Sequence, residues 1–151
     1  MALKLTLISV RPGAAHHAPL DAMVDEYLKR CGRDLPSTTR VFRTEKLLLD
    51  WVGIERAAGA ATLWLADLGG TNLTSEQLAA RLGTVRDGAT RHLMVGIGPA
   101  DGWSDTARKV AELRLSLSAM TLPHELARLI LAEQIYRAVT ILQGHPYHLG
   151  H

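Results

Sequence analysis

The sequence contains a single cysteine, Cys31, which excludes an internal disulfide and a cysteine-based zinc site. No apolar run approaches the roughly 18 residues that a membrane-spanning helix needs. The charges nearly cancel, because 17 lysine and arginine residues face 15 acidic residues and leave a formal net charge of +2. This balance excludes a strongly polybasic protein but still permits an enzyme that acts on RNA. We therefore expect a soluble, cytoplasmic protein with no membrane or metal partner.

The length and composition favour a single folded domain. The chain has 151 residues, and we expect residues 1–151 to form one domain. Apolar residues make up 47% of the sequence, enough to bury a core and to exclude general disorder. The short apolar stretch Leu5–Val10 is typical of a first strand and not of a signal peptide.

Apolar periodicity predicts strands and helices in alternation. The expected strands are Leu3–Val10, Val41–Phe42, Thr62–Ala66, Leu93–Ile97 and Leu115–Ser118. The expected helices are Leu20–Cys31, Leu47–Ala60, Thr74–Val85, Ser104–Arg114 and His124–Leu142. This order favours an α/β fold with a mainly parallel sheet flanked by helices. Ligands of such sheets bind beyond the carboxyl ends of the strands, where we place the loops Asp67–Gly70, Gly98–Gly102 and Ala119–His124.

The glycine-rich segment Gly96–Gly102 lies between an expected strand and an expected helix. It does not match the dinucleotide-binding fingerprint, because its third glycine falls one residue late and no acidic residue follows about 20 positions further on. The chain has no Gly-Lys pair, which excludes a phosphate-binding P-loop. The segment is therefore either a plain strand-to-helix turn or a contact for a nucleoside-like ligand.

The last expected helix is apolar nearly all round, which is typical of a helix buried in a core or a subunit interface. It nevertheless carries Glu133 and Arg137, four residues apart and hence on one face. Two interpretations remain open. The residues form an ordinary ion pair, or Glu133 holds Arg137 toward a phosphate or a base edge.

Two further segments leave alternatives open. The tail around His145, Tyr147 and His148 has no helix or carboxylate to support a metal, so it is either a frayed terminus or a segment that contacts a nucleobase. Between Lys29 and Lys46, six basic residues face two acidic ones. That segment is either an RNA-facing patch or a solvated charged surface.

Three motifs, taken together, resemble one family. They are the segments Leu117–His124, Ala132–Ala138 and His145–His148, with sequences LSAMTLPH, AEQIYRA and HPYH. They resemble the RlmH family, the ribosomal large-subunit pseudouridine N3-methyltransferases of the SPOUT superfamily. The resemblance implies a homodimer with a C-terminal trefoil knot that binds S-adenosylmethionine in the knot. It also implies methyl transfer to N3 of a pseudouridine in 23S ribosomal RNA, with the assembled ribosome as partner.

The resemblance also implies which residues form the site. The expected cofactor contacts are Ala66, Gly98, Leu117, Ser118, Ala119, Met120, Thr121 and Leu122. The expected catalytic set is Arg137 positioned by Glu133, with His124, Tyr147 and His148 on the substrate side. The chain departs from the family pattern at Pro99, where a second glycine is common, and at Ala66, which is often leucine. It also lacks the basic residue that commonly follows the tail motif. The alternatives are a SPOUT enzyme acting on another RNA and a non-enzymatic α/β binding module.

Overall fold

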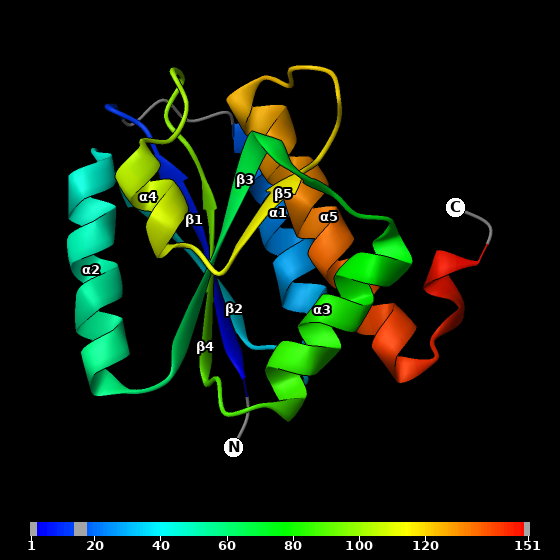
Figure 1. Ribbon diagram of the computed structural model, residues 1–151. Coiled ribbons are helices and arrows are strands. Elements are labelled where there is room, and N and C mark those ends of the chain that lie inside the picture. The colour runs from blue at the N-terminus through cyan, green and yellow to red at the C-terminus, as the bar shows by residue number, and fades with distance from the viewer. Residues whose placement is uncertain (1–2, 14–17, 150–151) are drawn as a thin grey trace.

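The computed structural model describes residues 3–13 and 18–149, which form a parallel sheet covered by helices on both faces (Figure 1). The strands are β1 (Lys4–Val10), β2 (Ser37–Phe42), β3 (Ala61–Asn72), β4 (His92–Ile97) and β5 (Leu113–Ser116). The helices are α1 (Ala18–Arg30), α2 (Glu45–Ala58), α3 (Ser75–Asp87), α4 (Asp105–Val110) and α5 (His124–Gln143), followed by a 3-10 turn, η1 (Pro146–His148). The strand order is β2-β1-β4-β3-β5, and every neighbouring pair is parallel. The predicted α/β class is confirmed. The trefoil knot stays a prediction.

The two faces of the sheet bury separate cores. In β1, Leu5 and Leu7 join α1, α3 and α5 in one core, whereas Ile8 and Val10 join α2 and α4 in the other. This division follows from the alternation of side chains along a strand. Figure 1 shows the same arrangement, with α2 and α4 on one side of the sheet and α1, α3 and α5 on the other. The carboxyl ends of the strands are left for loops.

Side-chain caps fix where several helices begin. Thr74 and Gln77 form the predicted capping box of α3: the Gln77 amide donates to the Thr74 hydroxyl at 3.1 Å, and the Thr74 amide donates to Oε1 of Gln77 at 2.9 Å. The Ser104 hydroxyl accepts the Ala107 amide at 3.1 Å and starts α4, as predicted. These caps fix the chain direction immediately after β3 and after the Gly98–Gly102 loop.

Several predicted boundaries are wrong. β2 begins at Ser37 and not at Val41, and β5 covers Leu113–Ser116 and not Leu115–Ser118. The segment Asp67–Gly70 does not end β3, because the strand continues to Asn72 through a bulge in which Ala66 and Thr71 both pair with Leu115. Glycine at position 70 permits this, since an added Cβ would lie 2.7 Å from the Arg114 carbonyl carbon.

The predicted fourth helix also runs too far. It ends at Val110, and Arg114 lies in β5, where it pairs with Leu65. The buried side chains of Leu113 and Leu115 on either side supply the alternating pattern of a strand.

Candidate functional site

A cavity of about 800 Å³ lies beyond the carboxyl ends of β3, β4 and β5. The bulge of β3, the loop between β4 and α4, and the loop between β5 and α5 form its walls, together with Arg108 and the start of α5. A volume of this size is typical of small-molecule and cofactor sites. A second cavity, between the Leu3 and Leu142 regions, measures about 70 Å³ and is too small for a nucleoside. The larger cavity is the candidate site, at the sheet edge expected from the fold.

The cavity brings together most of the predicted cofactor residues. Of those eight residues, seven line it: Ala66, Gly98, Leu117, Ser118, Met120, Thr121 and Leu122. Ala119 lies in the same loop and is exposed, but it does not line the cavity. Pro99, the departure from the family pattern, also lines the cavity and adds no amide donor to it.

Trp103 forms part of this cavity and was not among the predicted site residues. Its side chain is 4% exposed, and its indole Nε1 donates to the Ala66 carbonyl oxygen at 2.8 Å. The ring lies so close to Gly98 that an added Cβ there would be 2.7 Å from Trp103 Cε2. Gly98 is thus needed for the packing of Trp103, in addition to any backbone contact with a ligand. No local sequence signal marks this contact, because Trp103 and Ala66 are 37 residues apart in the chain.

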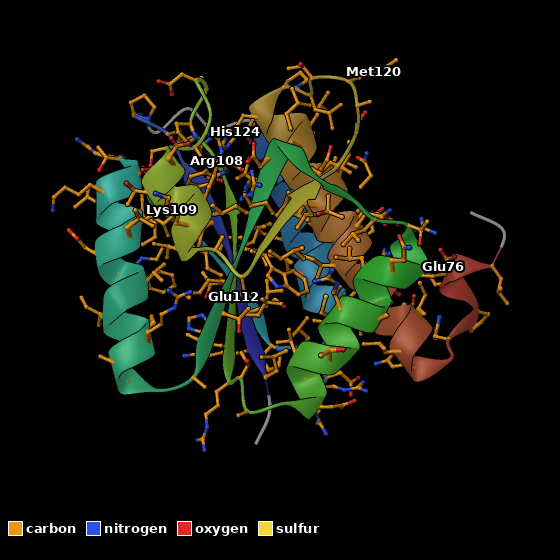
Figure 2. The ribbon with its side chains drawn as sticks, in the orientation of Figure 1. Glu76, Arg108, Lys109, Glu112, Met120 and His124 are labelled. Atoms are coloured by element: carbon orange, nitrogen blue, oxygen red, sulfur yellow. The ribbon has the colours of Figure 1, made fainter. Side chains whose placement is uncertain are left out.

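The loop between β5 and α5 is held by its own serines. The Ser116 hydroxyl donates to the Ser118 carbonyl oxygen at 2.9 Å, and the Ser118 hydroxyl accepts the Met120 amide at 2.9 Å. These bonds fix the backbone and leave the Met120 side chain 77% exposed at the rim. Figure 2 shows Met120 on this loop, at the same end of the molecule as Arg108 and His124. The loop therefore presents an ordered backbone to the cavity.

His124 begins α5 and contacts the Gly98 loop. Its Nδ1 lies 3.2 Å from the Gly98 carbonyl oxygen, so Nδ1 carries the hydrogen and donates it. Nε2 is buried and has no hydrogen-bond partner among residues 3–13 and 18–149. Burial lowers the pKa of His124, more than the nearby Glu125 raises it. The imidazole is accordingly neutral and ties the start of α5 to the cavity wall.

Ion pairs anchor the start of α5 to the rest of the fold. Arg11, which follows β1, donates to Glu125 at 2.5 Å. The buried Arg128 bonds to Asp21 of α1 at 2.6 Å and lies 3.7 Å from Glu125. A buried charge without a partner is strongly destabilising, so these pairings favour the observed position of the start of α5, where His124 lies.

Charged side chains line one part of the cavity and were also not predicted. The Asp67 side chain is 7% exposed, and its Oδ2 accepts from Arg108 Nε at 3.0 Å and from Arg114 Nη1 at 3.2 Å. Burial alone would raise the pKa of Asp67, but the hydrogen bonds from the two arginines hold it below its usual value. Asp67 and Arg108 both line the cavity, which therefore has a carboxylate and a guanidinium in its wall.

Three other predicted catalytic residues, Glu133, Arg137 and Tyr147, meet beside the C-terminal half of α5. Arg137 Nη2 donates to Glu133 Oε2 at 2.6 Å, and the Tyr147 hydroxyl donates to the same oxygen at 2.9 Å. The Arg137 guanidinium lies 5.3 Å from the centre of the Tyr147 ring. Burial, followed by the bond to Glu133, raises the pKa of Tyr147. The side chain of His148 lies outside the described part of the structure.

This Glu133–Arg137–Tyr147 cluster is remote from the cavity of its own chain. Arg137 lies 13 residues after His124 on α5, which at 1.5 Å per residue is about 20 Å along the helix axis. None of Glu133, Arg137 and Tyr147 lines the cavity. The expected site is thus divided into two parts, one at the start of α5 and one in its C-terminal half.

Comparison with known proteins shows which family the chain belongs to. The family described as "Predicted SPOUT methyltransferase" matches residues 3–148. A protein of Koribacter versatilis named "Ribosomal RNA large subunit methyltransferase H" is 40% identical over 149 residues, which are 99% of this chain and 100% of that relative. The chain belongs to the SPOUT methyltransferase family. A Sinorhizobium fredii protein of the same name is 52% identical over 91 residues, or 60% of this SPOUT chain and 57% of the relative.

Solved structures agree on the SPOUT fold. The SpoU methyltransferase AviRb from Streptomyces viridochromogenes, in complex with the cofactor AdoMet, matches with a TM-score of 0.55 at 16% identity. The match covers 95% of this chain and 59% of that one. A probable methylase family protein from Haemophilus influenzae matches with a TM-score of 0.56 at 10% identity, covering 96% and 69% of the two chains. At such identities the likeness concerns the fold alone.

Two features are absent from the described residues of this SPOUT chain. No group of three or more histidine, cysteine, aspartate or glutamate side chains among them is arranged to hold a metal ion. No helix in the same residues is long and apolar enough to cross a membrane.

Two histidines of the SPOUT domain, the buried His92 and the half-buried His124, predict a stability that depends on pH. Burial lowers the pKa of His124 and of His92, which lies 3.2 Å from Glu55 and 2.8 Å from the Thr6 hydroxyl. As the pH falls below about 6.5, the unfolded chain takes up protons that the folded chain does not, and folding is weakened. We expect the free energy of unfolding in urea to decrease from pH 7.5 to pH 5.5. The variant His92→Gln with His124→Asn should show a flatter dependence; an equally steep one would contradict the assignment.

Proposed function

We propose that the chain transfers the methyl group of S-adenosylmethionine to N3 of a pseudouridine in the large-subunit (23S) ribosomal RNA, in the cytoplasm and on assembled ribosomes. The observation that carries the proposal is the cavity formed by the β3, β4 and β5 loops. It occurs in a SPOUT chain that aligns along its whole length with a ribosomal RNA large subunit methyltransferase H. Membership of the family supports the reaction class, and the relative's name supports the RNA.

The cavity fits S-adenosylmethionine in size and in chemistry. About 800 Å³ accommodates a nucleoside with an amino-acid tail. Leu117, Leu122 and the ordered backbone of their loop suit an adenine ring, which needs apolar surface and a few backbone hydrogen bonds. Asp67 and Arg108 supply the opposite charges that a zwitterionic amino-acid group requires. When bound, the cofactor supplies an electrophilic methyl group on a sulfonium.

The residues of the chain then align the acceptor and stabilise its charge. N3 must pass its proton to the solvent before it acts as a nucleophile, and the anion formed needs a positive neighbour. We assign that role to Arg137, which Glu133 holds in place at 2.6 Å and whose guanidinium lies against Tyr147. His124 is a positioning residue, since its Nδ1 bonds to Gly98 and its Nε2 is buried. The tail, with Tyr147 and His148, completes the substrate side.

A homodimer would reunite the two parts of the site. Exposed apolar side chains of α1 and α5, namely Met23, Leu126 and Ile130, lie on the outer surface of these helices. Leu126, Ile130, Glu133 and Arg137 are spaced by three or four residues, so they share one stripe of α5. A second copy covering this stripe would bury the apolar residues and carry its own Glu133–Arg137–Tyr147 cluster toward the cavity. We therefore propose that each site combines the cavity of one protomer with the cluster of its partner.

This arrangement predicts that breaking the dimer abolishes activity. Replacing Ile130 with glutamate places a charge in the proposed interface, where an unpaired buried charge is costly. We expect sedimentation velocity to give a monomer, with methyl transfer lost and the fold retained by circular dichroism. Replacing Ile54 of α2 with glutamate is the matched control, because Ile54 is also an exposed isoleucine but lies on the opposite face of the sheet. A fully active Ile130→Glu monomer would refute the composite site.

Radiolabelled S-adenosylmethionine tests the reaction itself. The protein is incubated with ribosomes that lack the modification and, in parallel, with free ribosomal RNA and transfer RNA. Label at N3 of a large-subunit pseudouridine, from ribosomes and not from free RNA, is the expected result. Label at another position or on transfer RNA would indicate a SPOUT enzyme with a different substrate. Cofactor binding by calorimetry without any label would contradict the proposed substrate set, and no cofactor binding would indicate a binding module.

A further inference from the structure

We propose that Arg40, Arg43 and Lys46 form a contact surface for the RNA backbone, separate from the cavity and from the Glu133–Arg137–Tyr147 cluster. We call these three residues the β2–α2 basic surface. The inference rests on the proposed function, because it assumes a ribosomal RNA substrate. It concerns where the RNA is held and not where it is methylated.

The structure divides the basic segment seen in the sequence into two groups. Arg30 bonds to Glu26 at 3.0 Å and lies over the rings of Tyr27 and Tyr136, so it belongs to the surface of α1 and α5. Arg40 and Arg43 lie beyond, in the second half of β2 and directly after it. The six residues of β2 span about 20 Å at 3.3 Å per residue. Only the second group therefore lies toward the carboxyl end of the sheet, where the cavity is.

Arg40 lies against two aromatic rings while its charge stays exposed. Its Cζ lies 4.9 Å from the centre of the Phe42 ring and 5.0 Å from that of Trp51, and these two rings are themselves in contact at 5.4 Å. The residue is exposed, and it has no ion-pair partner among residues 3–13 and 18–149. A guanidinium stacked on aromatic rings loses less conformational entropy when it binds a phosphate than a free side chain does.

The acidic residues near this surface are already bonded elsewhere. Glu45 accepts from the backbone amide and the hydroxyl of Ser104, so its carboxylate is directed to the start of α4. Glu55 lies at His92, and Asp50 bonds to Lys46 at 3.0 Å in an exposed pair. Exposed pairs of this kind are weak and can exchange for a phosphate. Within residues 3–13 and 18–149, Arg40 and Arg43 therefore have no ion-pair partner, and Lys46 has this one weak pair.

The β2–α2 basic surface lies close enough to the cavity for one RNA strand to contact both. β2 is one of the two edge strands, and β1 separates it from β4, whose end contributes to the cavity. Neighbouring strands are about 4.8 Å apart, so Arg43 lies roughly 10 Å from the end of β4 along one edge of the sheet. An RNA of a few nucleotides spans that distance. Phosphate contacts at such a place supply affinity without reading sequence.

Kinetics on ribosomes that lack the modification test this surface. For Arg40→Glu with Arg43→Glu, we expect KM for ribosomes to rise at least about tenfold and the salt slope of affinity to decrease by about 2. We expect kcat and the Kd of S-adenosylmethionine to stay unchanged. Arg40→Lys, which keeps the charge and loses the planar stack, should fall between wild type and Arg40→Glu. Urea unfolding of each variant separates lost RNA contact from lost stability.

Arg81→Glu is the matched control for Arg40→Glu, because Arg81 is an exposed arginine on α3, across the sheet from α2. An equal rise in KM for this control would mean that net charge alone matters and would overturn the proposal, as would an unchanged KM in Arg40→Glu with Arg43→Glu. If Arg40→Glu unfolds, Arg40→Gln gives the same comparison without a reversed charge. If the wild-type protein labels no ribosomes, the proposed function fails. Filter binding of 23S ribosomal RNA to the same variants then still tests whether the β2–α2 basic surface binds RNA.

Discussion

Replacing Arg137 with alanine is expected to abolish methyl transfer while leaving S-adenosylmethionine binding intact. Arg137 donates to Glu133 at 2.6 Å and does not line the cavity, so its loss removes no cofactor contact of its own chain. It removes the positive charge that we assign to the N3 anion. Loss of one such donor lowers kcat by about 10²- to 10³-fold in other enzymes. Single-turnover methylation of ribosomes and calorimetry with the cofactor measure the two quantities separately.

Two variants separate the charge of Arg137 from its geometry. Arg137→Lys keeps the charge but cannot make the two-pronged bond to Glu133, and we expect an intermediate rate. Glu133→Gln keeps Arg137 but removes the carboxylate that holds both Arg137 and Tyr147, and we expect a reduced rate with unchanged cofactor affinity. Wild-type turnover in Arg137→Ala would refute the assigned role. Weakened cofactor binding in that variant would show that Arg137 also supports the cavity.

Local patterns predicted the elements of the fold because each is set by nearby residues. The capping box at Thr74 and the cap at Ser104 lie where they were expected, since a cap depends on residues three positions apart. The end of β3 was mispredicted for the opposite reason. The strand continues past Gly70 because β5, more than 40 residues later, supplies a partner on the other side of the bulge. A pairing of that range leaves no mark in the residues of the strand itself.

In the candidate site, too, residues in short motifs were predicted, and residues whose role depends on contacts between separate loops were not. The resemblance identified the loop Leu117–Leu122 and the pair Glu133 and Arg137, because these are short motifs. Trp103, Asp67 and Arg108 were missed, since their importance arises from contacts between separate loops: Trp103 with Ala66, and Arg108 with Asp67. No spacing along the chain predicts such pairs. The separation of His124 and Arg137, by contrast, follows from the predicted helix His124–Leu142, because 13 residues at 1.5 Å per residue place them about 20 Å apart.

Replacing Gly98 with alanine is the second change with a large expected effect. The new Cβ would lie 2.7 Å from Cε2 and 2.8 Å from Nε1 of Trp103, so either the indole or the Gly98 loop must move. Moving the indole breaks its 2.8 Å bond to the Ala66 carbonyl oxygen. Overpacking of this kind costs about 1–3 kcal/mol. If that strain falls on the cofactor-binding form of the loop, the affinity for S-adenosylmethionine falls by about 10- to 100-fold.

Calorimetry, urea unfolding and tryptophan fluorescence measure the consequences of Gly98→Ala. Gly53→Ala is the matched control, because Gly53 lies in α2 and an added Cβ there meets nothing within 4 Å. We expect that control to be neutral or slightly stabilising. The double variant Gly98→Ala with Trp103→Leu should regain affinity, since the smaller side chain leaves room for the methyl group. Full cofactor affinity in Gly98→Ala alone would show that the loop tolerates the clash and would contradict the prediction.

The Gly98→Ala and Arg137→Ala variants together decide whether the site is shared between protomers. In a mixed dimer, the Arg137→Ala protomer keeps an intact cavity and the Gly98→Ala protomer keeps an intact Glu133–Arg137–Tyr147 cluster. If each site combines one protomer's cavity with its partner's cluster, one of the two sites is complete, and mixing restores up to half of the wild-type activity per mixed dimer. If each site lies within one chain, every site carries a defect and mixing restores nothing. The 13 residues that separate His124 from Arg137 on α5 favour the first result.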